Sequence, residues 1–224
     1  SGGPARRLTY WAHHSTSSRG WIDPHTVLAT SAHGQPFDFH TWAYTVPLDG
    51  GPGVRQPYGP VSDLHCAGGH TLLLTGAASH DPAHWKRYRG GGTGRLWLDG
   101  RRLLADLPGQ LASPMIVGDR VVFLSDHEGT GNLYSCAFDG SGLTRHTDHD
   151  GFYARHAATD GRRIVYVRAG ELWLLPDLDA EPERLEIVLG GAGIGRRPYR
   201  APRHVTGLSC DRTGRASAVE MAGA

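Results

Sequence analysis

The run His146-Thr147-Asp148-His149-Asp150 places two imidazole and two carboxylate side chains within five residues. Imidazole nitrogens and carboxylate oxygens at such close spacing are typical of zinc sites. The run also falls between two groups of expected strands, where aspartate is an ordinary solvated turn residue. We therefore expect a turn at this position, and we expect no metal and no cofactor in this chain.

A second candidate is the glycine-rich run Gly90-Gly91-Gly92-Thr93-Gly94-Arg95. Backbone N–H groups in a glycine loop can hold phosphate oxygens. A phosphate-binding loop also requires a following Gly-Lys-Ser or Gly-Lys-Thr and a helix. Neither signal is present here, and the residues that follow favour a strand. The run therefore predicts a structural loop.

Nucleophilic catalysis by serine would be indicated by a Gly-x-Ser-x-Gly elbow. The sequence contains no such pattern. Serine and histidine are both frequent along the chain, but the sequence alone cannot place any of them together. We expect no catalytic residue in this chain.

Two basic segments contain tyrosine, at residues 86–89 and 196–203. Such segments can bind nucleic acid through phosphate contacts and base stacking. The chain as a whole has 23 basic and 22 acidic residues, with a formal charge of +1. Because this balance gives no overall attraction to a polyanion, we expect no nucleic-acid partner.

Targeting signals also bear on the function. No run approaches the roughly 18 apolar residues of a membrane span, and Ser1–Arg7 lacks the apolar core of a signal peptide. Cys66, Cys136 and Cys210 are isolated and lie beside apolar residues, which predicts reduced thiols buried in strands. We expect a cytoplasmic protein with no membrane partner.

The elements that would position these residues are expected to be strands. The chain has 32 glycines and 14 prolines, and its apolar residues fall in short clusters cut by Asp-Gly or glycine-rich turns. Helix signals are nearly absent. This pattern is typical of an all-β fold.

A repeat near 40 residues indicates the architecture. Val117–Phe123 recurs as Asp160–Tyr166, with Arg120 and Arg163 at matching positions 43 residues apart. A second marker ends in an aromatic residue and occurs at Ala43-Tyr44, Leu96-Trp97, Leu133-Tyr134 and Leu172-Trp173. A period of this length, with about four strands, is that of a β-propeller blade. We expect each aromatic side chain to fill the gap between adjacent blades.

The predicted fold is thus all-β, with propeller blades of four antiparallel strands. The blades are expected at residues 20–65, 66–108, 109–153 and 154–190. Asp99-Gly100 and Asp139-Gly140-Ser141-Gly142 suit the hairpins between outer strands.

Three regions are predicted along the chain: 1–190 as a partial six-bladed propeller, 191–207 as a linker, and 208–224 as the truncated start of a second propeller. Arg6–Thr9 is expected to be the tail of an earlier blade. Asp211–Glu220 is expected to be the first strand of the second propeller. An incomplete ring would leave an unpaired sheet edge and an uncovered apolar face.

The stretch His84–Trp97 resembles the six-bladed propeller of the tricorn proteases, as do Ser113–Arg120 and Asp126–Ser135. Tyr153–His156 and Thr159–Ile164 continue the resemblance in order. It extends from about residue 8 to residue 187, and its Trp-Lys-Arg-Tyr-Arg-Gly-Gly segment is fairly specific. The Asp-Gly-Arg turns are less so, because TolB-type and dipeptidyl-peptidase propellers share them.

The resemblance implies a large cytosolic serine peptidase that assembles as a hexamer. In that family a six-bladed propeller precedes a seven-bladed one, and the catalytic domains and a PDZ-like domain follow. The chain would be a non-catalytic propeller segment that serves as channel or gate and as assembly scaffold. Its implied partners are peptide substrates or products, other domains of the parent protease, and homo-hexamer subunits. The alternative is a stand-alone TolB-like propeller that acts as a protein-binding scaffold.

The resemblance also implies a role for Arg19. In the family, a loop of the six-bladed propeller at this place presents adjacent arginines that anchor the C-terminal carboxylate of the substrate. An arginine suits a carboxylate because it donates two parallel hydrogen bonds. This sequence has one arginine, Arg19, and Ser18 at the other position. Arg19 is therefore a candidate substrate-binding residue, and a plain surface arginine is the competing interpretation.

Overall fold

The computed structural model describes residues 5–11, 13, 15–76, 86–188 and 205–221. Every regular element within these ranges is a strand. Two compact units are present, one within residues 1–186 and the other within residues 187–224. They are described separately below.

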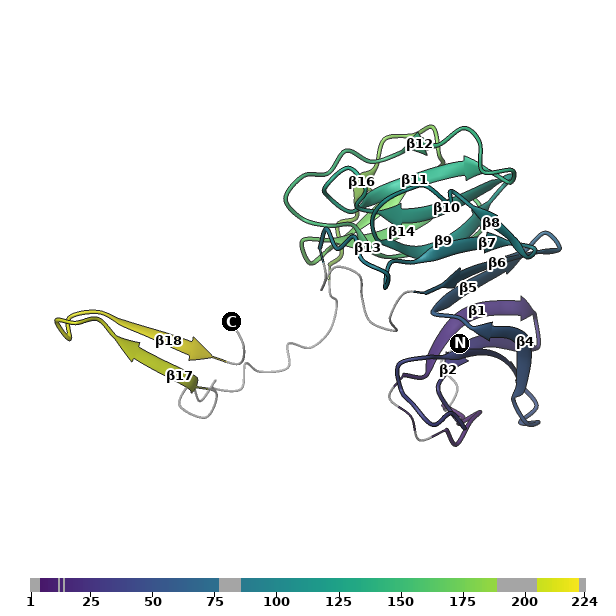
Figure 1. The fold of residues 1–224 in the computed structure, drawn as a ribbon, viewed down its shortest axis with the longest axis horizontal. Helices are drawn as coiled ribbons and strands as arrows, with labels where there is room; N and C mark the ends of the chain where they lie inside the picture. The colour runs from purple at the N-terminus through teal and green to yellow at the C-terminus, as the bar shows by residue number, and fades with distance from the viewer. Residues whose placement is uncertain (1–4, 12, 14, 77–85, 189–204, 222–224) are drawn as a thin grey trace. The chain divides into compact units, whose positions relative to one another are not determined.

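The first unit contains four antiparallel sheets of four strands each (Figure 1). The first sheet consists of β1 (Ser17–Asp23), β2 (Thr26–Ser31), β3 (Trp42–Pro47) and β4 (Val54–Pro60). The second sheet consists of β5 (Asp63–Ala67), β6 (His70–Thr75), β7 (Arg95–Leu98) and β8 (Arg101–Leu103). In both sheets, each strand pairs with the next strand along the chain.

The other two sheets repeat this arrangement. The third consists of β9 (Leu111–Val117), β10 (Arg120–Ser125), β11 (Asn132–Ala137) and β12 (Thr144–Arg145). The fourth consists of β13 (Arg155–Thr159), β14 (Ile164–Arg168), β15 (Glu171–Leu175) and β16 (Glu183–Arg184). The first strands of successive sheets contact one another, β1 with β5, β5 with β9 and β9 with β13. The sheets are therefore propeller blades, and the predicted all-β propeller fold is confirmed.

Glycine-containing turns form the tight hairpins inside the blades. Asp99 and Gly100 join β7 to β8 with φ angles of 49° and 81°, and Ala169 and Gly170 join β14 to β15 with 52° and 80°. Positive φ at both central residues is the geometry that matches the twist of a two-residue hairpin. The hairpin predicted at Asp99-Gly100 is confirmed.

The prediction that the repeated aromatic residues fill the gaps between adjacent blades is confirmed for Tyr134 and Trp173. Phe123 pairs across the strands with Tyr134, and both are buried in the core between the second and third blades. Tyr166 pairs with Trp173 in the core between the third and fourth blades. Each pair belongs to the later blade and covers the earlier one. These two apolar interfaces supply most of the buried core of the first unit.

The first blade has a different covering on its far face. Tyr44 packs there with Ala29 and Val46, and the N-terminal residues Leu8 and Trp11 close the cluster. The Trp11 and Tyr44 ring centroids are 4.6 Å apart. Residues 6–9, predicted as the tail of an earlier blade, form no strand, and the partly buried Leu8 side chain packs against the blade face.

Some predicted boundaries differ from the observed ones. The boundary between residues 65 and 66 cuts through β5, and the first blade begins at Ser17 rather than at residue 20. The repeat markers lie on the second and third strands of each blade. They therefore locate the middle of a blade better than its innermost strand.

The second unit is a hairpin of β17 (Val205–Cys210) and β18 (Ser217–Met221). The strand predicted over residues 211–220 is wrong in its first half. Asp211 Oδ1 accepts the Arg215 N–H at 3.0 Å and the Ala216 N–H at 3.3 Å, which closes a turn. Residues 205–207 of the predicted linker belong to β17, and residues 191–204 lie outside the described residues. Cys210 is exposed, contrary to the expectation of a buried thiol.

Asp126 is a buried aspartate whose carboxylate accepts several hydrogen bonds, and only 1% of its side chain is exposed. Its carboxylate accepts the Arg87 N–H at 2.8 Å and the Gln110 N–H at 2.8 Å. It also accepts hydrogen bonds from Arg89 at 3.0 Å and from the Tyr153 hydroxyl at 3.0 Å. Burial, together with the Asp126 contact, raises the pKa of Tyr153 to about 12, so the phenol remains a donor. Asp126 thus ties the loop before β7 and the segment before β13 to the third blade.

We expect Asp126→Ala to lower the free energy of unfolding by about 2–4 kcal/mol, because buried donors and the Arg89 charge lose their acceptor. Urea unfolding followed by tryptophan fluorescence measures the loss. Asp119→Ala, in an exposed turn of the same blade, is the control and should change stability by less than about 0.5 kcal/mol. Equal losses in the two variants would contradict the role assigned to Asp126.

Candidate functional site

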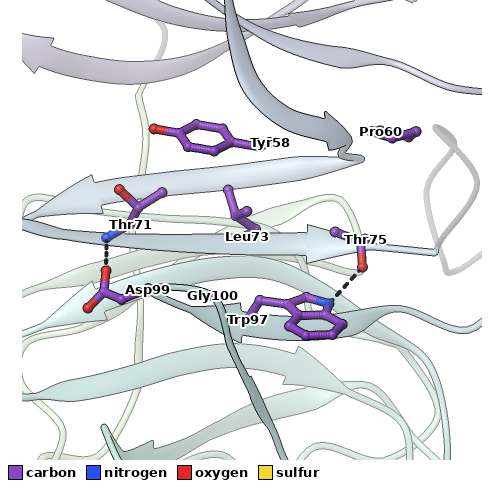
Figure 2. A pocket seen from close by; sticks show the side chains of 8 residues that line it. All are labelled: Tyr58, Pro60, Thr71, Leu73, Thr75, Trp97, Asp99 and Gly100. Carbon is purple, nitrogen blue, oxygen red and sulfur yellow. Dashed lines mark hydrogen bonds between the residues drawn. The ribbon is translucent and has the colours of Figure 1, made fainter.

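An apolar groove lies between the first two blades. Its volume is about 610 Å³. The outer strand β4 contributes one wall, and β6, β7 and the turn after β7 contribute the other (Figure 2). The lining residues are Tyr58, Pro60, Thr71, Leu73, Thr75, Trp97, Asp99 and Gly100. A volume in this range is typical of sites that hold a small ligand.

The floor of the groove is apolar. Leu73 and Trp97 are cross-strand partners on β6 and β7, and both are half-buried. The Trp97 indole N–H donates to Thr75 Oγ1 at 2.9 Å (Figure 2). Because this N–H already has an acceptor, Trp97 offers a ligand its ring surface rather than a polar group.

Asp99 gives the groove one charged end. Its carboxylate accepts the Thr71 N–H at 2.8 Å and contacts His70 Nδ1 at 2.6 Å. The His70 contact and the Thr71 N–H lower the pKa of Asp99, so the carboxylate is anionic at neutral pH. Its side chain is 47% exposed. The groove can therefore bind an apolar side chain next to a cation or an N–H donor.

The sequence pattern identified Trp97 and Asp99 only as markers of the fold. It did not assign any residue of the groove to a site. The available signal was the polar pair Thr71 and Asp99, at positions where the later blades have apolar residues. The polar pair can be recognised as unusual only after the strands of the second blade are aligned in register with those of the later blades.

Arg19, the substrate-binding candidate from the sequence, lies on β1, the innermost strand of the first blade. Its Nε donates to Thr30 Oγ1 at 2.9 Å, and its Nη2 donates to the Ser62 carbonyl at 3.0 Å. Its Nη1 lies 3.2 Å from Asp63 Oδ2. Burial raises the pKa of Asp63, and the Arg19 guanidinium opposes that effect. The guanidinium thus connects the first blade to the start of the second.

Ser135 and His146 form a close serine–histidine contact in the third blade. Ser135 Oγ lies 2.6 Å from His146 Nε2, and His146 Nδ1 lies 2.7 Å from the Leu178 carbonyl. A carbonyl can only accept, so Nδ1 carries the proton and Nε2 accepts from the serine hydroxyl. Arg120 Nε donates to the same hydroxyl at 2.8 Å. Burial lowers the pKa of His146, which keeps the imidazole neutral.

This geometry has the form of an activated nucleophile, since a serine donates to a neutral imidazole. However, Ser135 has no solvent exposure. A substrate carbonyl has no access to its hydroxyl. The contact is therefore structural, and through the Leu178 carbonyl it links the third blade to the fourth.

The ligand-type residues between His146 and Asp150 point to separate partners. Asp148 pairs with Arg145 at 2.5 Å. His149 Nε2 lies 2.7 Å from the Tyr166 hydroxyl. Within the described ranges, no three histidine, cysteine, aspartate or glutamate side chains are grouped as a metal would require.

The first basic segment is also engaged internally. Lys86 lies 5.3 Å from the Tyr153 ring centroid, and Arg87 donates to the Gly129 carbonyl at 3.0 Å. Arg89 pairs with Asp126. The segment therefore anchors the loop before β7 to the third blade. The second basic segment, 196–203, lies outside the described residues. Among those that are described, no helix has the length and apolar character needed to cross a membrane.

We expect the free energy of unfolding to fall as the pH drops from 6.5 to about 4. Burial, with Arg168 as a second cause, lowers the pKa of His149 from 6.5 to about 4. The unfolded chain therefore takes up this proton more readily, and the contribution of His149 is complete above pH 6.5 and lost toward pH 4. His149→Gln should remove about 2 kcal/mol of the drop, since one pKa unit corresponds to about 1.4 kcal/mol and solvent screens part of the shift.

Urea unfolding at a series of pH values provides the measurement. The same exchange at the exposed His40 is the control and should leave the pH dependence unchanged. A wild-type stability that is flat between pH 6.5 and 4 would contradict the prediction, as would equal curves for wild type and His149→Gln.

Comparison with known proteins gives the family. The model of the tricorn protease N-terminal β-propeller domain matches residues 1–181. A tricorn protease homologue of Streptomyces coelicolor is 56% identical over 235 residues, which covers 99% of this chain and 20% of the homologue. A second homologue from the same organism is 53% identical, and the match covers 99% of this chain and 22% of that homologue. The chain thus spans about a fifth of the length of these curated relatives.

A solved structure of similar fold supports the same family. The crystal structure of the tricorn protease superposes with a TM-score of 0.74 at 29% identity, over 84% of this chain and 19% of that chain. A TolB structure from Agrobacterium tumefaciens has a TM-score of 0.53 at 14% identity, over 71% of this chain and 60% of that chain, and shows a shared fold only. The aligned blades and the domain match lead to one conclusion. The chain belongs to the tricorn protease family and corresponds to its N-terminal propeller region.

Proposed function

We propose that this chain is a non-catalytic propeller segment of a cytoplasmic, tricorn-like serine peptidase. In this role it shapes the passage of peptides as a channel or gate, and it supports a hexameric assembly. The observation that carries the proposal is the match of residues 1–181 to the N-terminal propeller domain of a protease family. Peptide substrates or products, other domains of the parent protease and neighbouring subunits are the proposed partners.

The side chains within the described residues support a non-catalytic role. Ser135 donates to a neutral imidazole and is fully buried, and Ser125, whose Oγ lies 3.0 Å from His127 Nδ1, is 2% exposed. The strongly bonded charges, such as Asp126, serve to hold loops and blades together. The exposed concave surface between the first two blades is instead apolar with one carboxylate at its end. Such a surface suits binding rather than bond cleavage.

We propose that Arg19 contributes to binding the C-terminal carboxylate of a peptide. A guanidinium has five N–H donors, and the contacts with Thr30, Ser62 and Asp63 use one N–H on each nitrogen. A peptide carboxylate would therefore share the guanidinium with Asp63. This competition gives the proposal a direct test.

The purified chain should not react stoichiometrically with a serine-directed covalent probe, and it should not hydrolyse a panel of fluorogenic peptides. The reason is that the serines in the two described serine–imidazole contacts, Ser135 and Ser125, are buried. Intact-mass spectrometry after labelling provides the measurement. Complete labelling of one serine would overturn the non-catalytic assignment.

For Arg19, a labelled peptide with a free C-terminal carboxylate should bind about tenfold more tightly than its C-terminal amide, because a charge-assisted hydrogen bond contributes about 1.5–3 kcal/mol. Fluorescence anisotropy measures both affinities. Arg19→Gln should abolish the difference, and Asp63→Asn should increase affinity for the free carboxylate. Arg55→Gln, an exposed arginine of the same blade, is the control. Equal binding of acid and amide by wild-type protein would rule out the carboxylate role.

A further inference from the structure

The groove exists because the second blade departs from the pattern of the later blades. Each later blade presents two cross-strand pairs to the blade before it. These pairs are Phe123–Tyr134 and Val121–Cys136 in the third blade, and Tyr166–Trp173 and Ile164–Leu175 in the fourth. Trp173 is half-buried, and the other seven residues are no more than 1% exposed. Both later interfaces are filled with apolar side chains.

In the second blade, one pair is smaller and the other is polar. Leu73–Trp97 takes the place of the two-aromatic pair. Thr71 and Asp99 take the place of the aliphatic pair, joined by the Asp99 N–H to the Thr71 carbonyl at 3.0 Å. A leucine occupies less volume than phenylalanine or tyrosine, and an ionised carboxylate does not pack into an apolar interface.

The opposite wall does not fill the space that results. Tyr58 is half-buried and Pro60 is exposed on β4, the outermost strand of the first blade. A groove of about 610 Å³, open to solvent, lies between these two blades. A groove of about 480 Å³ also lies between the third and fourth blades, but polar and charged residues such as Arg120, Asp177 and Asp179 form much of its lining.

The dimensions and chemistry of the groove favour a short peptide as occupant. The volume falls within the range of small-ligand sites, about 300–1,000 Å³, whereas a protein domain would require a far larger surface. The rings of Trp97 and Tyr58 and the Leu73 side chain offer an apolar contact. Asp99 lies in the turn after β7, two residues beyond Trp97, and lines the same groove. The groove thus offers a carboxylate and an apolar surface to one ligand, and the first residue of a peptide carries an α-ammonium next to its side chain.

We propose that this groove binds the N-terminal residue of a peptide whose first side chain is large and apolar. The side chain lies against Leu73 and Trp97, and the α-ammonium lies at the Asp99 carboxylate, beside His70. This inference rests on the proposed function, since it assumes that the chain handles peptides. It adds a binding site and a preference for the N-terminal residue.

Isothermal titration calorimetry with the whole 224-residue chain tests the proposal. Three probes are used: Phe-Ala-Ala, Ser-Ala-Ala and N-acetyl-Phe-Ala-Ala. We expect Phe-Ala-Ala to bind at least about tenfold more tightly than Ser-Ala-Ala, since a buried aromatic ring dominates such a site. We expect N-acetylation to weaken binding by about fivefold or more, because it removes the charge that faces Asp99.

Two variants locate the binding. Leu73→Phe introduces the residue found at this position in the third blade and should weaken Phe-Ala-Ala binding about tenfold by filling the groove. Asp99→Asn should remove the preference for the free amine while leaving the apolar preference. Leu143→Phe makes the same change at a residue outside the groove that is 41% exposed, and it should bind as wild type. Circular dichroism verifies that each variant is folded.

Wild-type affinities in folded Leu73→Phe and Asp99→Asn would overturn the groove assignment and leave the proposed function standing. Absence of Phe-Ala-Ala binding to wild type would also overturn it, while the probe-labelling and Arg19 experiments judge the proposed function separately. If sedimentation shows a wild-type dimer that Leu73→Phe dissociates, a second copy of the chain occupies the groove and the peptide proposal is wrong.

Discussion

The four described blades are sheets with apolar faces, and the fold depends on stacking these faces against one another. A four-stranded sheet cannot bury its faces by itself, so each blade must stack on its neighbours. The pairs Phe123–Tyr134 and Tyr166–Trp173 meet this constraint by covering the preceding blade with aromatic rings. On the first blade, Leu8 and Trp11 cover the far face in place of a preceding sheet.

Apolar stacking does not by itself fix how one blade is oriented on the next, and buried polar groups supply this precision. The Asp126 carboxylate accepts hydrogen bonds from the loop before β7, from the residue before β9 and from the Tyr153 hydroxyl. His146 connects Ser135 in the third blade to the Leu178 carbonyl in the fourth. Hydrogen bonds require defined distances and angles, so each of these contacts favours one of the many orientations that apolar stacking alone would allow between two blades. Residues with catalytic-type side chains, such as Ser135 and His146, therefore have a structural role here.

The groove between the first two blades lies where the face of the second blade is less completely covered by apolar side chains. The second blade carries Thr71 and Asp99 at positions that are apolar in its successors, and the space they leave open is lined by Trp97 and Tyr58. A less complete interface lowers the area buried between these blades and so reduces their mutual stabilisation. Arg19, which contacts Ser62 and Asp63 from the first blade, partly offsets this loss at the innermost strands.

The amino-acid sequence by itself determined the blades. The repeat of Arg120 at Arg163 and the recurring aromatic residues depend on neighbours along the chain, and they predicted four-stranded units. Local sequence also predicted two hairpins, at Asp99-Gly100 and at residues 139–142. Only the tertiary structure decided which side chains meet. Tyr58 and Trp97 face one groove although 39 residues separate them, and Asp63 pairs with Arg19 across 44 residues. Such contacts depend on strand register and on the stacking of whole sheets, which local periodicity does not encode.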